Sequence, residues 1–287
     1  VVGNGHNELG SDSNLADGTP IQSVTLTIPK GTRIEVERHN DLDGPRVSFL
    51  QVTRGSRIMA QGTADEPIVF HDEGLSYYQT GEWGGIVIQG LAGHSDCAAD
   101  SSICNAMNVH GAGLDQPVRV STLGYAGGNN EDDSSGVLSY VVISGAGRNG
   151  ESRFDSAEET LFETPLAGLS LQSVGKGTII ENIQINHQGN GSDAALDVSG
   201  GSVGIKQLAI SHHERDSILL RSGYQGNLQD VFVSQNFHGV HQRVAIRAVS
   251  EAGTQRITKP TVANALIVAG KSEPCLDCGG DSESFDF

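Results

Sequence analysis

The chain has 287 residues, of which 37% are hydrophobic, only 5% are aromatic and 38 are glycine. Few aromatic side chains with many glycines and Val/Ile runs favour short strands joined by tight turns over a helical bundle. The formal net charge of −17 disfavours nucleic acid or an anionic membrane as a partner, since both bind Lys/Arg-rich surfaces. No run of apolar residues reaches the roughly 18 that a membrane span needs.

The first strand signals follow a polar tail at residues 1–20. The segments 24–36 and 50–70 each contain a strand, a glycine turn and a second strand. Both turns have the pattern Gly-Thr/Ser-Arg-Ile, which begins at Gly31 in the first segment and at Gly55 in the second. This recurrence indicates that a repeated structural unit begins near residue 21.

The only tryptophan of the chain lies in the stretch GEWGGIVIQG, at position 83. The flanking glycines and the apolar strand that follows favour a buried plug at a corner of the fold. The alternative is an exposed platform that stacks on a sugar ring.

The four cysteines fall into two close pairs. Cys97 and Cys104 lie in an insertion at residues 89–121, and Cys275 and Cys278 form the sequence CLDC. We expect two local disulfides and therefore an oxidising compartment. A zinc site formed by all four cysteines is the alternative, which the spacing of the first pair disfavours.

The clearest internal repeat lies between residues 178 and 234. TIIENIQIN recurs as VGIKQLAIS and GNLQDVFVS, which makes Ile183, Leu208 and Val231 equivalent at nearly equal separations. A second strand type alternates with these copies. Looser copies occur at 138–145 and 264–270, and insertions interrupt the repeat at 89–121, 147–165 and 236–260.

A period of about 24 residues with two or three short strands is typical of one coil of a parallel β-helix. One coil cannot bury its own apolar face, so stacked coils must form a shared Val/Ile/Leu core. The sequence therefore predicts an all-β fold, a parallel β-helix at residues 21–270 with loop insertions. A leucine-rich repeat lacks its template here, and a β-sandwich does not explain why the copies keep their register.

Three segments carry more specific motifs: GTADEPIVF at 62–70, GEWGGIVIQG at 81–90 and YAGGNNEDDSSGVLSYVVISGAG at 125–147. Together they resemble a family of secreted right-handed β-helix proteins of Gram-negative bacteria, with similarity over about residues 50–270. Its members are mostly uncharacterised exported or outer-surface proteins. The resemblance implies an extracellular or outer cell-surface location in a Gram-negative bacterium. The chain departs from the family pattern at Asp193 and at its C-terminus.

A group of histidine, arginine and acidic residues falls on turns that a β-helix would stack on one side. Such groups bind acidic sugars or abstract a proton beside a carboxylate, whereas the alternative is a solvated corner with surface ion pairs. The candidate catalytic residues are His212, His213, Arg215 and Asp216. The candidate ligand-binding residues are His187, Asp193, His238, His241 and Arg243.

Two acidic loops have the oxygen ligands that calcium requires. Asp41 and Asp43 precede Gly44 at alternate positions, and Glu131, Asp132 and Asp133 form a denser run. Ca²⁺ takes six to eight such oxygens. Structural calcium is the one cofactor that the sequence suggests, although acidic runs are usually only solvated.

These patterns together favour an exported, non-catalytic module that binds a polysaccharide or a surface protein. A polysaccharide lyase or hydrolase is the first alternative, although the motifs of polygalacturonases and pectate lyases are missing. A self-assembling fibre subunit is the second, because the open edges of a solenoid pair readily with another chain. The final residues 271–287 are expected to form an acidic and truncated segment.

Overall fold

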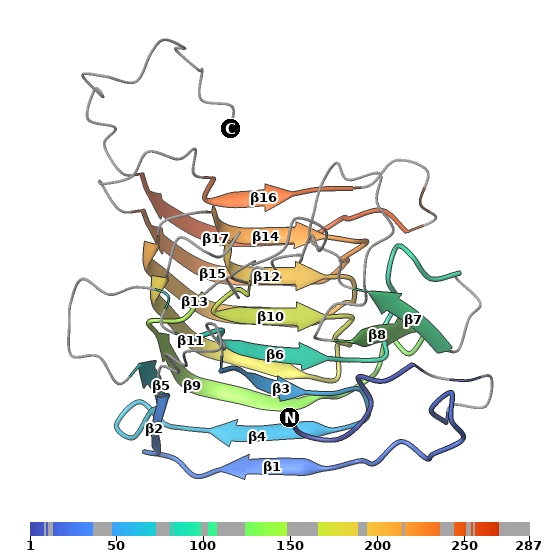
Figure 1. The fold of residues 1–287 in the computed structure, drawn as a ribbon. Helices are drawn as coiled ribbons and strands as arrows, with labels where there is room; N and C mark the ends of the chain where they lie inside the picture. The colour runs from blue at the N-terminus through green and yellow to red at the C-terminus, as the bar shows by residue number, and fades with distance from the viewer. Residues whose placement is uncertain are drawn as a thin grey trace, which may run out of the picture.

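The computed structural model describes residues 1–8, 10, 14–36, 48–72, 81, 83–98, 103–107, 124–147, 166–188, 194–213, 216–235, 244–250, 254 and 256–269. Within these ranges the chain winds into a right-handed parallel β-helix, as the repeat and the family resemblance together predict (Figure 1). Its N-terminal and C-terminal coils lie at opposite ends of the solenoid. None of the described ranges forms a helix with the length and hydropathy that crossing a membrane demands.

One wall of the solenoid is a six-stranded sheet in which every neighbouring pair is parallel. Its order follows the coils from one end of the molecule to the other, because each coil contributes one strand. In that order its strands are β3 (Leu50–Val52), β6 (Ile86–Gln89), β10 (Leu169–Gln172), β12 (Ala194–Ser199), β14 (Asp216–Arg221) and β16 (Ile246–Ala248).

The other two walls belong to one bent, nine-stranded sheet. In the early coils each wall has its own strand, and in the later coils one long strand crosses the bend. The early strands are β1 (Thr25–Ile28), β4 (Arg57–Gln61), β2 (Arg33–Val36) and β5 (Ile68–Asp72). The long strands are β9 (Gly136–Ser144), β11 (Ile179–Gln188), β13 (Gly204–His213), β15 (Asn227–Ser234) and β17 (Thr261–Val268).

The bend recurs at one position in every long strand. β4 pairs with Gly136–Ser139 of β9 and β5 pairs with its later residues, so the corner lies at Tyr140. The residue at this corner has a left-handed backbone, with φ between 51° and 58°, in each of the five strands. Asparagine and aspartate tolerate this conformation better than most residues, and they fill three of the positions. The corner residues are Tyr140, Asn182, Gln207, Asp230 and Asn264.

The register confirms the repeat that the sequence predicts. Ile183 pairs with Leu208, which pairs with Val231, and all three side chains are buried. The core is a set of such apolar columns that run along the solenoid axis. Parallel pairing from coil to coil excludes the β-sandwich alternative.

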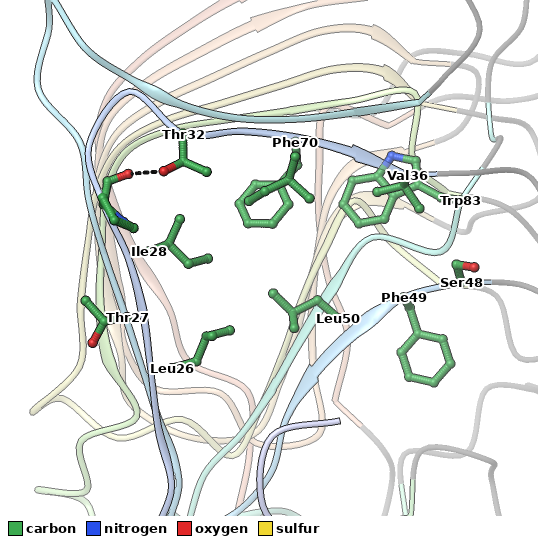
Figure 2. Close-up of a pocket in the computed structure, with 12 residues that line it drawn as sticks. Leu26, Thr27, Ile28, Thr32, Val36, Ser48, Phe49, Leu50, Phe70 and Trp83 are labelled. Atoms are coloured by element: carbon green, nitrogen blue, oxygen red, sulfur yellow. Dashed lines mark hydrogen bonds between the residues drawn. The ribbon is translucent and has the colours of Figure 1, made fainter.

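The N-terminal residues contact the first coils. Val2 forms a parallel bridge with Val52, so part of the tail expected at residues 1–20 extends the six-stranded sheet. The inside of the solenoid opens at this end into an apolar cavity of about 450 Å³. Figure 2 shows Ile28, Leu50 and Phe70 pointing into it from three different strands.

A small antiparallel hairpin of β7 (Ile103–Met107) and β8 (Tyr125–Gly128) lies near the carboxyl ends of the six-stranded sheet (Figure 1). Gly127 N–H donates to the carbonyl of Gly90, which immediately follows β6. The hairpin and the turns around it form the corner described next.

Candidate functional site

A cavity of about 310 Å³ lies at the corner where β6 ends. Four segments that are distant in the sequence supply its walls: the turn after β6, the turn after β8, the turn after β14, and the segment before β17. The lining residues are Gly93, His94, Cys97, Ala98, Gly128, Asn129, Glu131, Gln225 and Arg256. The coils bring them together because each coil returns to this corner once.

An ion pair forms one side of this corner cavity. Arg256 Nη1 lies 2.8 Å from Glu131 Oε1 and Nη2 lies 3.3 Å from Oε2, which is a two-point contact. Arg256 also donates to the carbonyls of Gly223 at 2.6 Å and Gly201 at 3.1 Å. The guanidinium is thus fixed by acceptors from three coils, which gives the cavity a rigid wall.

Gly93 leaves room for this arrangement. A Cβ at position 93 would lie 2.7 Å from Arg256 Nη1 and 2.8 Å from Glu131 Oε1, closer than real Cβ contacts. Its backbone N–H donates to Glu131 Oε1 at 3.1 Å. Any side chain at this position would therefore separate the ion pair from the turn.

His94 lies beside the ion pair and is 4% exposed. Its Nδ1 accepts the backbone N–H of Asp96 at 3.2 Å, and its Nε2 lies 3.2 Å from Ser199 Oγ on β12. Nδ1 also lies 3.5 Å from the carboxylate oxygen Oδ2 of Asp96, so both ring nitrogens have polar neighbours. Burial raises the pKa of the nearby Asp96 carboxyl.

The outward face of the six-stranded sheet continues from this corner with buried polar side chains. Gln51 Nε2 donates to Gln89 Oε1 and Gln89 Nε2 donates to Gln172 Oε1, each at 3.0 Å. Gln172 Nε2, at the end of this amide ladder, is buried and has no hydrogen-bond partner among the described residues. All three glutamines are 1% exposed or less.

Two further ion pairs join neighbouring strands of the same sheet. Asp197 on β12 accepts from Arg221 on β14 at 2.7 and 3.0 Å, and both side chains are nearly buried. Asp216 on β14 pairs with Arg247 on β16 and accepts the N–H of Val244 at 2.9 Å. These carboxylates are neutralised inside the protein, which limits them as ligands for an external cation.

The structure describes three of the four candidate catalytic residues. His213 is 1% exposed, and its Nε2 lies 2.8 Å from Ser217 Oγ. His212 is exposed and has a left-handed backbone, with φ of 52°. Asp216 is buried in the pair with Arg247, and Arg215 lies outside the described residues.

Of the candidate ligand-binding residues, only the backbone of His187 is described. It lies in β11 at the level of His212 in β13, because the flanking pairs are Asn186 with Ser211 and Gln188 with His213. His187 and His212 are therefore neighbours in two adjacent parallel strands. The remaining four residues lie outside the described ranges: Asp193, His238, His241 and Arg243.

The acidic run expected to bind calcium is divided among different partners. Glu131 pairs with Arg256, Asp132 pairs with Lys176 at 3.0 Å, and Asp133 Oδ2 accepts the N–H of Leu91 at 3.2 Å. Burial raises the pKa of Asp133. No group of three or more metal-binding side chains occurs in the part of the chain that the structure describes, which does not include Asp41 and Asp43.

Trp83 is a core residue and 1% exposed. Its Nε1 donates to the carbonyl of Ser144 at 2.8 Å, and its ring stacks on Phe70 with centroids 6.1 Å apart. The plug interpretation is therefore confirmed for the single tryptophan. Figure 2 shows its ring at one edge of the N-terminal cavity.

The Cys97–Cys104 disulfide is formed, whereas Cys275 and Cys278 lie outside the described residues. A buried arginine that sequence reasoning missed holds this loop. Arg54 donates to the carbonyls of Gly5, Asn7 and Cys104, each at 2.7 Å, and is fully buried. Desolvation lowers the pKa of its guanidinium to about 10.

Comparison with known proteins finds one family whose model covers the whole solenoid. A family model described as a pectate-lyase-like beta helix domain matches residues 15–276, which include all the strands from β1 to β17. No curated protein and no solved structure matches the chain significantly.

Proposed function

We propose that this protein, which belongs to the pectate-lyase-like β-helix family, binds polysaccharide without cleaving it and does so at the corner cavity. The name of the family refers to an enzyme that acts on a polysaccharide, which supports a ligand of that class. The proposal for this chain rests on its own residues.

One observation carries the proposal: four distant segments bring amide, carboxylate, guanidinium and imidazole groups to one cavity. Its volume of about 310 Å³ is at the lower end of the range for small-molecule sites. Sugar hydroxyls both donate and accept hydrogen bonds, as do the exposed amides of Asn129 and Gln225. Carboxylate and guanidinium groups add charged acceptors and donors.

The same geometry favours binding over catalysis. A general base must be free to take a proton from the substrate. In the corner cavity the Glu131 carboxylate is held by Arg256, and both ring nitrogens of His94 are engaged by Asp96 and Ser199. On the alternative corner, His213 is buried against Ser217 and Asp216 is paired with Arg247.

We place the protein outside the cytoplasm, at the extracellular or outer cell surface. The Cys97–Cys104 disulfide supports this location, because such bonds persist in oxidising compartments.

A glycan array and a lyase screen on the same purified sample test the proposal. The lyase screen follows the absorbance of unsaturated uronate with and without EDTA, and a reducing-end assay detects hydrolysis. We expect binding to at least one polysaccharide and no product in either assay. Product release would overturn the non-catalytic function, and an array without any signal would overturn glycan binding.

The site itself is tested with the double variant Asn129→Ala/Gln225→Ala, which removes two exposed amides from the cavity. The matched control is Gln184→Ala, an exposed glutamine on the bent sheet. We expect the double variant to weaken binding about tenfold or more, since each lost hydrogen bond costs about 0.5–1.5 kcal/mol. Equal affinity of the double variant and the control would place the site elsewhere.

A further inference from the structure

The apolar columns of the core do not end in polar caps within the described residues. At the N-terminal end, Ile28, Ile34 and Leu50 line the open cavity of about 450 Å³ together with Phe70 and Trp83 (Figure 2). Polar side chains in the lining are limited to Thr27, Thr32 and Ser48. This end therefore has a mainly apolar cavity in which Ile34 and Leu50 are partly exposed.

The opposite end also exposes core positions. All eight residues of β17 are exposed, including Val262 at 39% and Ile267 at 45%. The residues directly beneath them in the preceding coil, Leu228 and Val233, are fully buried. The difference arises because no further coil covers β17 in the described part of the chain.

The two ends are complementary because they terminate the same columns. The column that begins at Ile28 runs through Ala60, Leu138, Ile180, Ile205 and Leu228 to Val262. A second column joins Ile34 to Ile267, and a third joins Val2, which pairs with Val52, to Ala248. All three walls therefore end at both faces in the same three-sided section.

The free backbone edge of β17 lacks the residues that usually prevent an edge strand from pairing with another chain. Its sequence TVANALIV contains no charge, no proline and no glycine, and charges and prolines are among the devices that usually block pairing at an edge strand. In the described residues it pairs with β15 on one side only. A small apolar ligand cannot satisfy its backbone N–H and C=O groups, whereas a parallel strand of a second chain can.

We propose that copies of this protein stack head to tail, with the β17 and β16 end of one copy on the N-terminal cavity of the next. At the usual strand spacing of about 4.8 Å, Val262, Ile267 and Ala248 of one copy cover Ile28, Ile34 and Val2 of the next. Each sheet then continues across the junction with parallel pairing. Such a contact does not close on itself, so it produces filaments.

The net charge of −17 opposes this stacking, and salt weakens the repulsion. Sedimentation velocity of the full chain over a range of protein and salt concentrations tests the proposal, with negative-stain microscopy of the largest species. We expect a ladder of oligomers that lengthens with both concentrations. A monomer under all conditions would overturn the inference.

Two variants block one end each. Ile267→Lys places a charge at the C-terminal end and Ile34→Lys at the N-terminal end, where the lysine of a free monomer can extend into water. Each variant alone is expected to stay monomeric, because stacking would bury an unpaired charge. A 1:1 mixture is expected to form heterodimers and nothing longer. The open C-terminal end of Ile34→Lys can bind the open N-terminal end of Ile267→Lys, and the two outer ends of this dimer are blocked.

The matched control is Ile179→Lys, which is 49% exposed in the middle of the solenoid and should assemble like the wild type. Thermal melts monitored by circular dichroism verify that each variant folds. Unchanged assembly of Ile267→Lys, or a mixture without heterodimers, would overturn head-to-tail stacking. Loss of assembly in Ile267→Lys but not in Ile34→Lys would indicate a contact between two C-terminal ends instead. The outcome does not depend on glycan binding.

Discussion

The side chains of Glu131 and Arg256 form a two-point ion pair although 125 residues separate them in the sequence. Arg256 follows β16, the last strand of the six-stranded sheet, and Glu131 follows the β7–β8 hairpin. This pair therefore joins an early and a late segment of the chain at the corner cavity.

Removing the Arg256 guanidinium is expected to destabilise the fold. Arg256→Met removes the guanidinium donor from the Glu131 carboxylate and from the carbonyls of Gly201 and Gly223, which we expect to cost about 1–3 kcal/mol. Urea unfolding measures the loss. The control is Lys176→Met, which breaks an exposed pair with Asp132 and should cost less than about 0.5 kcal/mol. Equal losses would show that the corner pair contributes no more than a surface contact.

Arg54 is expected to be indispensable for the N-terminal segment. Arg54→Lys keeps the charge, but one ammonium group cannot reproduce the planar fork that reaches three carbonyls from two segments. We expect a loss of about 2–4 kcal/mol, because carbonyls and a charge are left unsatisfied in the interior. Limited proteolysis should cut residues 1–8 faster than in the wild type. Unchanged proteolysis would mean that Val2 and its strand pairing alone hold this segment.

The contribution of Asp133 to folding stability should change with pH in the direction opposite to that of a salt-bridged aspartate. Burial raises its pKa in the folded state above the ordinary value of 3.8, so the folded protein takes up this proton first as the pH falls. Its contribution to stability is least favourable above the folded pKa and improves as the pH falls through that value towards 3.8. Asp133→Asn removes this dependence.

The measurement is urea unfolding of wild type and Asp133→Asn at pH 7 and at pH 4. We expect the stability of the variant relative to wild type to be greater at pH 7 than at pH 4. Asp132→Asn, at a neighbouring position that forms an ion pair with the exposed Lys176, is the control. A difference with the opposite sign would show that the hydrogen bond from Leu91 outweighs the burial of the charge.

Trp83 provides an intrinsic probe of the core. Trp83→Phe keeps an aromatic ring against Phe70 but loses the hydrogen bond to the Ser144 carbonyl, so we expect a cost of about 1–2 kcal/mol. Trp83→Ala should cost about 3–5 kcal/mol. In the wild type the fluorescence emission should be blue-shifted and unaffected by saturating polysaccharide. A ligand-dependent shift would support the sugar-platform interpretation that the buried position disfavours.

The sequence predicts the repeated part of the fold because repetition is a local signal. Ile183, Leu208 and Val231 keep their spacing, so their register follows from counting residues. The buried position of Trp83 follows similarly from its glycines and the strand beside it. Both features can be predicted because they depend on residues that lie close together in the sequence.

The corner cavity was not predictable in the same way. His94, Gln225 and Arg256 belong to different coils and share no spacing that a sequence pattern could reveal. Of its lining, only Glu131 was a candidate for binding, and as a calcium ligand. Gly93 gives a weak signal in retrospect, because a glycine soon after a buried strand indicates close approach by another segment. Arg54 was missed because most arginines are exposed.

The left-handed corner of the bent sheet has an evolutionary consequence. Corner residues Tyr140, Asn182, Gln207 and Asp230 stay in register although the first two are much further apart in the sequence than the others. Variation in length among these coils is therefore confined to the connections that lead to and from the six-stranded sheet. Insertions and deletions in these connections should therefore be tolerated, because the bend keeps the coils aligned.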